Sequence, residues 1–184
     1  MTVNEIFMDL SAHMIKGMMV HDQMADYYDF LSLRGYKRCH EYHYKHESCN
    51  YRKLHRYYLN HYNMLIDEAQ IDSPEAIPES WYKYRRQDVD PGTKKTAVKS
   101  GIMKWVDWEK ETKQLFCKAH RELLELHQEN AALFVECFIK DVDCELKWAE
   151  RKLIELSDVE YSLDYILQEQ KSLHDKYKKK MKKG

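Results

Sequence analysis

The feature that most constrains this chain is a pair of long amphipathic segments within residues 105–156, divided only by a short break at residues 128–130. Apolar residues recur at helical spacing through both segments, and this pattern predicts two long helices. A connection this short makes the two helices antiparallel neighbours. One glutamate lies inside each apolar stripe, Glu109 in the first segment and Glu145 in the second. We therefore expect the two carboxylates to face one core.

Two more long helices are predicted nearer the N-terminus, over residues 4–33 and 36–66. The first carries a methionine-rich inward stripe, which is typical of an adaptable core. His21 is the one polar ring at an inward position of that stripe. Gly35 is expected to close this helix, because glycine is the usual residue just beyond a helix end.

The helix predicted over residues 36–66 has an unusually polar inward face, built from tyrosine, histidine and asparagine. Three interpretations remain open. His43, with His46 or Glu47 one turn later, has the spacing of a metal-ligand pair. Alternatively, these side chains form a satisfied polar network with tyrosine hydroxyls and the acids of other helices. In the third interpretation the assumed face is one position off and most of these groups meet water. The metal-site candidates are His21, His43, His46, Glu47, Glu109 and Glu145.

Residues 67–99 interrupt the helical pattern and contain all three prolines of the chain. A connection this long is uncommon between helices of a compact domain. It is expected if the second and third helices are parallel, because the chain must then return along the whole bundle. The sequence therefore predicts an all-α four-helix bundle over residues 1–156, with one long crossover at 67–99.

Residues 157–184 are assigned to an additional C-terminal helix and a basic tail. Ser157 is a suitable N-cap, and Glu160 would complete a capping box for a helix from Asp158 to Lys180. Such a helix would fold against the bundle or dock on a partner. The tail is rich in lysine, which is typical of a solvated helix end, and nucleic-acid binding through it is a weakly supported alternative.

Two segments carry a family resemblance, residues 108–112 (WEKET) and residues 141–147 (DVDCELK). With the order of helices and the long crossover, they resemble the ferritin-like superfamily, especially bacterial ferritins, over roughly residues 5–156. The resemblance implies a dinuclear iron site built from inward carboxylates and Glu-x-x-His motifs. Glu109 is similar to the acid of the third helix in that family, and Glu145 to the late acid of the fourth.

The first two helices depart from the family pattern. Gly17 stands where a glutamate is expected on the first helix, and Glu47 is followed three residues later by Asn50 instead of histidine. The fourth helix has no histidine at the corresponding place. Two bridged irons need several anionic oxygens. These departures favour a degenerate or histidine-rich mononuclear site over a standard ferroxidase centre.

Composition and motifs narrow the function further. The net charge of −1 gives no global attraction to nucleic acid or membrane, and no apolar run is long enough to span a bilayer. The chain is expected to be cytoplasmic, with five reduced cysteines. Neither a glycine-rich phosphate loop nor a nucleophile-elbow motif is present. No catalytic residue is therefore assigned.

Two functions remain. The first is a non-enzymatic binding or regulatory protein on a ferritin-like scaffold, for example a regulator or inhibitor carried by a mobile element. Exposed aromatics in the crossover (Trp81, Tyr82 and Tyr84) would anchor its protein partner. The alternative is a protein that binds iron or another metal at the non-standard His/carboxylate site. The long C-terminal helix and its charged tail predict a monomer or dimer instead of a closed cage.

Overall fold

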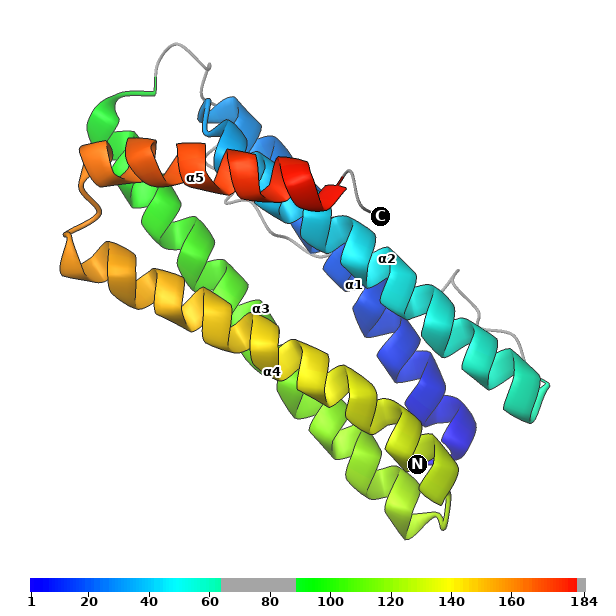
Figure 1. Cartoon of the computed structure of the whole chain (residues 1–184). Coiled ribbons are helices and arrows are strands. Elements are labelled where there is room, and N and C mark those ends of the chain that lie inside the picture. Colours follow the sequence, from blue (N-terminus) through cyan, green and yellow to red (C-terminus); the bar gives the residue numbers. More distant parts are fainter. Residues whose placement is uncertain (64–88, 182–184) are drawn as a thin grey trace.

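The computed structural model describes residues 1–63 and 89–181, and in this part of the chain the secondary structure is entirely helical (Figure 1). The helices are α1 (Val3–Phe30), α2 (Arg34–Tyr62), α3 (Pro91–Glu125), α4 (Glu129–Asp158) and α5 (Leu163–Met181). The predicted crossover aromatics Trp81, Tyr82 and Tyr84 lie outside the described residues. Within the described residues, no helix has the length and apolar character of a membrane span.

The four long helices form two antiparallel hairpins, α1 with α2 and α3 with α4, packed side by side (Figure 1). Helices α2 and α3 run in the same direction. The fifth helix crosses one end of the bundle and packs mainly on α2. This arrangement confirms the predicted all-α four-helix bundle with a long crossover and an additional C-terminal helix.

The helix starts follow ordinary capping chemistry. Thr2 and Glu5 form a reciprocal capping box at the start of α1. Asp90 accepts a hydrogen bond from the backbone N–H of Thr93 at 2.9 Å, and Pro91 occupies the first turn of α3. Residues 91–99, which the sequence pattern assigned to the crossover, are therefore helical. The proline marks a helix start and not a continuing loop.

Gly35 has a different role from the one predicted. Helix α1 already ends at Phe30, the left-handed position in the turn is Ser32 (φ 60°), and Gly35 lies inside α2. A Cβ atom added at Gly35 would lie 1.8 Å from the backbone oxygen of Gln170 in α5. Glycine is needed here because two helix backbones approach closely. This contact depends on a residue far along the chain, so local sequence did not reveal it.

The start of α5 was also predicted wrongly. Helix α4 continues through Ser157 to Asp158, and Glu160 and Tyr161 adopt left-handed conformations (φ 50° and 53°). The capping box proposed for Ser157 and Glu160 therefore does not form, and α5 begins at Leu163. Its buried residues, Ile166, Glu169, Leu173 and Tyr177, pack toward the bundle. The additional helix is thus a part of the folded domain.

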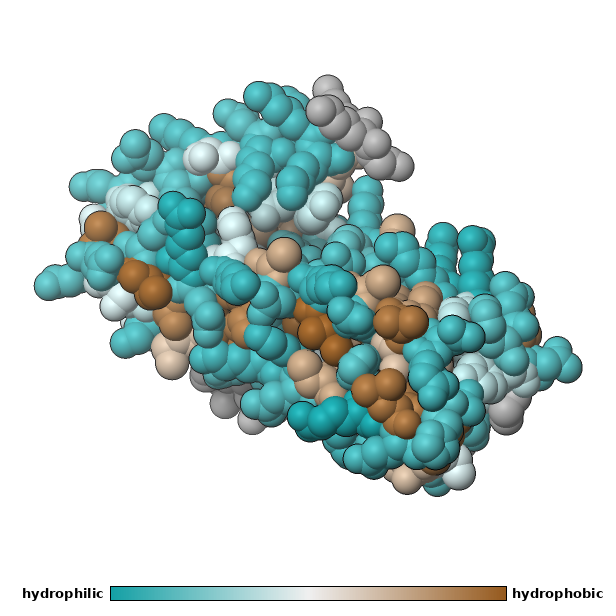
Figure 2. Space-filling model, turned by 60° about the horizontal axis from the view of Figure 1, so that its bottom comes forward, coloured by the Kyte–Doolittle hydropathy of each residue, from teal (hydrophilic) through white to brown (hydrophobic). Residues whose placement is uncertain are grey.

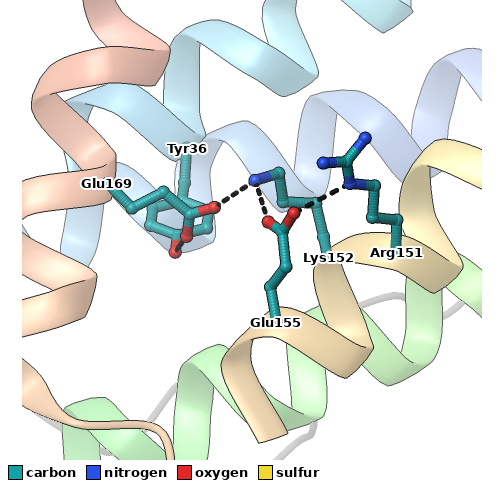
Figure 3. Close-up of polar contacts among 5 residues, drawn as sticks. All are labelled: Tyr36, Arg151, Lys152, Glu155 and Glu169. Atoms are coloured by element: carbon teal, nitrogen blue, oxygen red, sulfur yellow. Dashed lines mark hydrogen bonds and ion pairs between the residues drawn. The ribbon is translucent and has the colours of Figure 1, made fainter. Parts of the chain in front are cut away.

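A polar link fastens α5 to its neighbours (Figure 3). The Tyr36 hydroxyl of α2 donates a short hydrogen bond to Glu169, whose other oxygen lies 2.8 Å from Lys152 Nζ of α4. Lys152 also pairs with Glu155 on its own helix. Glu169 is buried, so the hydroxyl and the ammonium group compensate for the removal of its charge from water.

The core has two parts. One lies toward the start of α1 and is built from aliphatic and phenylalanine side chains, including Ile6, Phe7, Leu10, Phe116 and Leu123. The other lies beneath α5 and is rich in tyrosine and tryptophan, including Tyr28, Tyr36, Trp105, Trp108 and Tyr177. The candidate acids and histidines lie against this second part, because Trp105 contacts His21, His40 and His43.

Candidate metal centre

The structure brings the three predicted carboxylates into one buried region of the bundle. Glu47 comes from α2, Glu109 from α3 and Glu145 from α4. Glu47 and Glu109 are buried, with 7% and 1% of their surface exposed. The negative charge of Glu145 raises the pKa of both other carboxyls, and Glu47 also raises that of Glu109. Three helices therefore bring acids close enough to interact.

Glu145 is the acid that the histidines neutralise. Its Oε1 lies 2.9 Å from His46 Nδ1 and 3.4 Å from His43 Nδ1. Burial alone would raise the pKa of Glu145, but His43 and His46 hold it well below the usual range. The contact with Glu145 raises the pKa of His46, despite the opposing effect of burial. Burial would lower the pKa of His43, yet Cys39 and Glu145 together raise it.

Among residues 1–63 and 89–181, no cationic side chain forms an ion pair with Glu109. The indole N–H of Trp105 donates a hydrogen bond of 2.8 Å to Glu109 Oε1. Burial, together with the charges of Glu145 and Glu47, raises the pKa of Glu109 well above its ordinary value. The carboxyl of Glu109 therefore holds a proton more tightly than an exposed glutamate does.

Glu47 faces the glycine on α1. A Cβ atom added at Gly17 would lie 3.6 Å from Glu47 Cδ and 3.2 Å from Trp108 Cζ2. The Trp108 ring thus limits the space beside Gly17, and a glutamate there would require the ring to move. Burial and the Glu145 charge raise the pKa of Glu47 to about 7, although His46 and His43 oppose the rise. Helix α1 supplies no carboxylate to this region.

His21 is brought to other histidines and not directly to an acid. Its Nδ1 lies 3.0 Å from His40 Nδ1, so one ring donates a hydrogen bond to the other. The rings of His21 and His43 have centroids 5.3 Å apart. Burial, followed by the charge of His43, lowers the pKa of His21 to about 3 although Glu145 opposes this, and burial likewise lowers that of His40. Both rings are neutral at physiological pH.

Sequence reasoning missed two of the buried histidines, His13 and His40. His13 stacks on Trp108 with ring centroids 4.3 Å apart, and its Nε2 lies 2.7 Å from the Thr112 hydroxyl oxygen. A signal for both existed in the alternating three- and four-residue spacing of inward positions. On α1 the buried series is Ile6, Leu10, His13, Gly17, Val20 and Met24, and on α2 it is Tyr36, His40, His43, Glu47, Asn50 and Leu54.

The donor set suits one metal ion better than two. Carboxylate oxygens and imidazole nitrogens are ligands that iron(II) and zinc(II) accept. His43 Nε2, His21 Nε2 and His40 Nε2 are buried without a hydrogen-bond partner. However, across residues 1–63 and 89–181 no three histidine, cysteine, aspartate or glutamate side chains are arranged to hold an ion together. Because α1 supplies no acid to this region, a bridged pair of ions lacks the anionic oxygens it needs. Binding of one ion would require side chains to turn.

The fold is that of the ferritins. No family model matches the chain, and no curated protein matches its sequence. Among solved structures, a humanized archaeal ferritin is similar with a TM-score of 0.77 and 14% identity, covering 94% of each chain. An open-pore ferritin from Archaeoglobus fulgidus gives a TM-score of 0.77 at 12% identity, again over 94% of each chain.

A third structure extends the same likeness. A glutamate-to-glutamine variant of PmFTN, soaked in iron, gives a TM-score of 0.72 at 11% identity. That match covers 91% of the present chain and 96% of the other. At this level of identity the likeness defines the ferritin-like four-helix bundle. The function of the site depends on the residues that this chain itself places there.

Proposed function

We propose that the protein binds a single divalent transition-metal ion, iron(II) first among them, at the acid–histidine cluster of Glu47, Glu109, Glu145, His43 and His46. The observation that carries the proposal is the accumulation of three carboxyls in one buried region with histidine partners for only one of them. Glu145 is paired, whereas burial and mutual repulsion raise the pKa of Glu47 and Glu109. A cation is the partner that would favour their charged forms.

Protons take the place of that cation in the metal-free protein. Glu109 accepts a hydrogen bond from Trp105 and has a pKa raised well above its ordinary value, and Glu47 has a pKa of about 7. Metal ligands must be deprotonated, so binding would exchange these protons for the ion. Because His43 Nδ1 lies 3.4 Å from Glu145 Oε1, its Nε2, which has no hydrogen-bond partner among the described residues, would be the nitrogen left to bind the ion.

The likeness in fold supports iron as the first ion to test. One of the similar structures is described as soaked in iron, and the others are ferritins. This chain differs in having Gly17 and Trp108 beside Glu47, which supports one ion in place of two. His21 is the least supported of the six predicted ligands, because its Nδ1 already bonds to His40.

The test is an anaerobic titration of metal-free protein with iron(II), followed by thermal melting. An ion that binds only the folded state raises the melting temperature by mass action, so the midpoint should rise until one equivalent is added and then change slowly. The variant Glu47→Gln with Glu109→Gln should lose the response. His61→Ala is the matched control, because this histidine is exposed on α2 and bonds to the Tyr57 carbonyl. Equal responses in both variants would refute the assignment.

A non-enzymatic protein-binding role in the cytoplasm is the second candidate. Its specific support is the outer face of α4, where Leu133 and Ile154 are each 60% exposed. On the face shown in Figure 2, hydrophobic residues form several groups within a mainly hydrophilic surface. The additional helix no longer supports this candidate as a free docking element, because α5 is packed on α2.

The two candidates also predict different assembly behaviour. A regulator that works by binding another protein is expected to be a monomer or dimer, and its α4 surface should be buried in the complex. Light scattering of the purified chain tests the first point, and a 24-subunit particle would contradict it. Leu133→Ser with Ile154→Ser should leave metal binding unchanged, so the variant separates a surface role from the buried cluster.

A further inference from the structure

A pocket of about 420 Å³ lies between α2 and the C-terminal end of α5, and it shares only His46 with the acid–histidine cluster. Its volume is within the range of small-molecule sites. The residues that give it chemical character are Tyr42, Tyr44, Lys45, His46, Arg52 and Lys180. Aromatic and aliphatic surface forms most of the lining, and the charged groups are all basic.

Three basic side chains of the pocket, Lys45, Arg52 and Lys180, have no acidic partner within the described part of the chain, whereas His46 contacts Glu145. Among the described residues, no carboxylate lines the pocket, and neither Lys45, Arg52 nor Lys180 forms an ion pair. This contrasts with the surface of α4, where lysines such as Lys140 and Lys147 pair with acids one turn away. Three cations gathered around one concave surface repel each other unless an anion lies between them.

Helix α5 completes the pocket through contacts with aromatic rings. Lys180 Nζ lies 4.7 Å from the ring centroid of Tyr42 and 5.5 Å from that of Tyr177. Tyr177 is buried, and its ring centroid is 5.3 Å from that of Tyr42. The cation of Lys180 is therefore held over the aromatic wall by cation–π attraction. The Tyr42 ring is in turn nearly parallel to that of His46, with an interplanar angle of 5°.

We propose that this pocket is a binding site for a small organic anion in which a phosphate or carboxylate group is joined to a flat ring. The anionic group would be held by Arg52, Lys45 and Lys180, since guanidinium and ammonium groups form strong charge-assisted bonds with such oxygens. The ring of the ligand would lie against Tyr42 and Tyr44. His46 connects the pocket to the buried cluster, because it lines the pocket and also contacts Glu145.

Anion binding at this site does not require the proposed metal ion. It is therefore tested in protein from which metal has been removed with a chelator, after the chelator itself has been removed by dialysis. Phenyl phosphate and benzoate are titrated separately by calorimetry at low salt. We expect one of them to bind at a single site with a dissociation constant below about 1 mM, and phenol, which has the ring without the charge, not to saturate. Comparing the two anions identifies whether phosphate or carboxylate is preferred.

Substitutions assign the binding to the pocket. Arg52→Gln and Lys45→Gln should each weaken it roughly tenfold, because each removes one charge-assisted contact. Both side chains are exposed, so the variants should fold normally. Arg56→Gln is the matched control, an exposed arginine one turn further along α2 that does not line the pocket. Its affinity should stay within about twofold of the parent.

Three results would overturn the proposal. The first is failure of both anions to bind, and the second is equal affinity in Arg52→Gln and Arg56→Gln. The third concerns the lysines at the end of α5, which could instead attract a polyanion. A single-stranded oligonucleotide that binds the parent and not Arg52→Gln, in the absence of binding by phenyl phosphate or benzoate, would identify a nucleic-acid surface in place of the small-anion site.

Discussion

The two parts of the core differ in what keeps them buried. The part toward the start of α1 is mainly apolar and includes Phe7, Leu10 and Phe116 together with the tyrosines Tyr51 and Tyr58. The part beneath α5 borders buried histidines and acids whose neighbours alter their pKa values. Burial of apolar surface stabilises the first without further conditions. The second requires each ionisable group to find a partner or a proton, so it is suited to binding and more sensitive to pH.

The largest single effect should come from the apolar part. Phe116→Ala removes a buried ring that packs against Phe138, with centroids 5.7 Å apart. The lost burial and the remaining cavity should lower the free energy of unfolding by about 3–5 kcal/mol. Urea denaturation measures this loss. If the two parts of the core are independent, the metal-induced rise in melting temperature should persist in this variant. Loss of that rise would mean that the two parts are not independent.

A pH experiment examines the polar part. The pKa of Glu47 is about 7 in the folded chain, whereas the ordinary value for an unperturbed glutamate is 4.5. The folded state therefore binds this proton more tightly than the unfolded state does. Its stabilising contribution is therefore present below pH 4.5 and is lost as pH rises through 7. Glu47→Gln should not lose it. Relative to the parent, the variant should gain up to roughly 3 kcal/mol between these limits.

Denaturation of both proteins across the same pH series checks this prediction. Other groups titrate in the same range, but they are common to the two chains, so only the difference between the curves is used. A constant difference from acid to alkaline pH would show that Glu47 is already charged in the folded protein.

Gly35 lies where α2 contacts α5, the helix that packs over the polar part of the core. In Gly35→Ala the new methyl group would meet the backbone of Gln170, which cannot move as a side chain can. We expect a loss of about 1–3 kcal/mol, concentrated in the attachment of α5. Hydrogen exchange should show reduced protection over residues 163–181 and unchanged protection around Phe116. Uniform loss of protection would argue that α5 and the bundle unfold together.

The smallest effect is expected on the surface, away from both parts of the core. Asp143 forms ion pairs with Lys113 and Lys147, both at 2.5 Å. These contacts lower the pKa of Asp143 to about 2, but the pairs are solvent-exposed and screened by salt. Asp143→Asn should therefore change the melting temperature less than any variant above. Repeating the comparison in high salt should remove even that difference.

Much of the fold could be predicted from periodicity. The spacing of Glu109 and Glu145 within apolar stripes correctly placed both acids on the inner side of their helices, and the proline-rich interruption gave the parallel relation of α2 and α3. Helix ends were less predictable. Gly35 and Ser157 each fit a familiar end signal, but packing against α5 and continuation of α4 override these local preferences.

The sequence indicated which residues lie in the candidate site better than it indicated how their side chains are arranged. Of the alternatives left open on α2, His43 and Glu47 lie on the buried face, His46 is half-buried, and further along the helix Tyr58 is buried while His61 is exposed. The spacing of residues along a single helix could not show that Glu145 contacts both His43 and His46. It also could not show that the Trp105 indole donates a hydrogen bond to Glu109. These partners come from different helices or depend on rotamers, which a linear pattern does not determine.

The most direct test of the account is a count of the protons released when a metal ion binds. Calorimetric titration with zinc(II) or iron(II) near pH 6, repeated in buffers of different ionisation enthalpy, gives this number. We predict one ion per chain and the release of at least one proton, since the pKa of Glu47 is about 7 and that of Glu109 is also raised. Absence of binding, or binding without proton release that survives Glu47→Gln with Glu109→Gln, would contradict it.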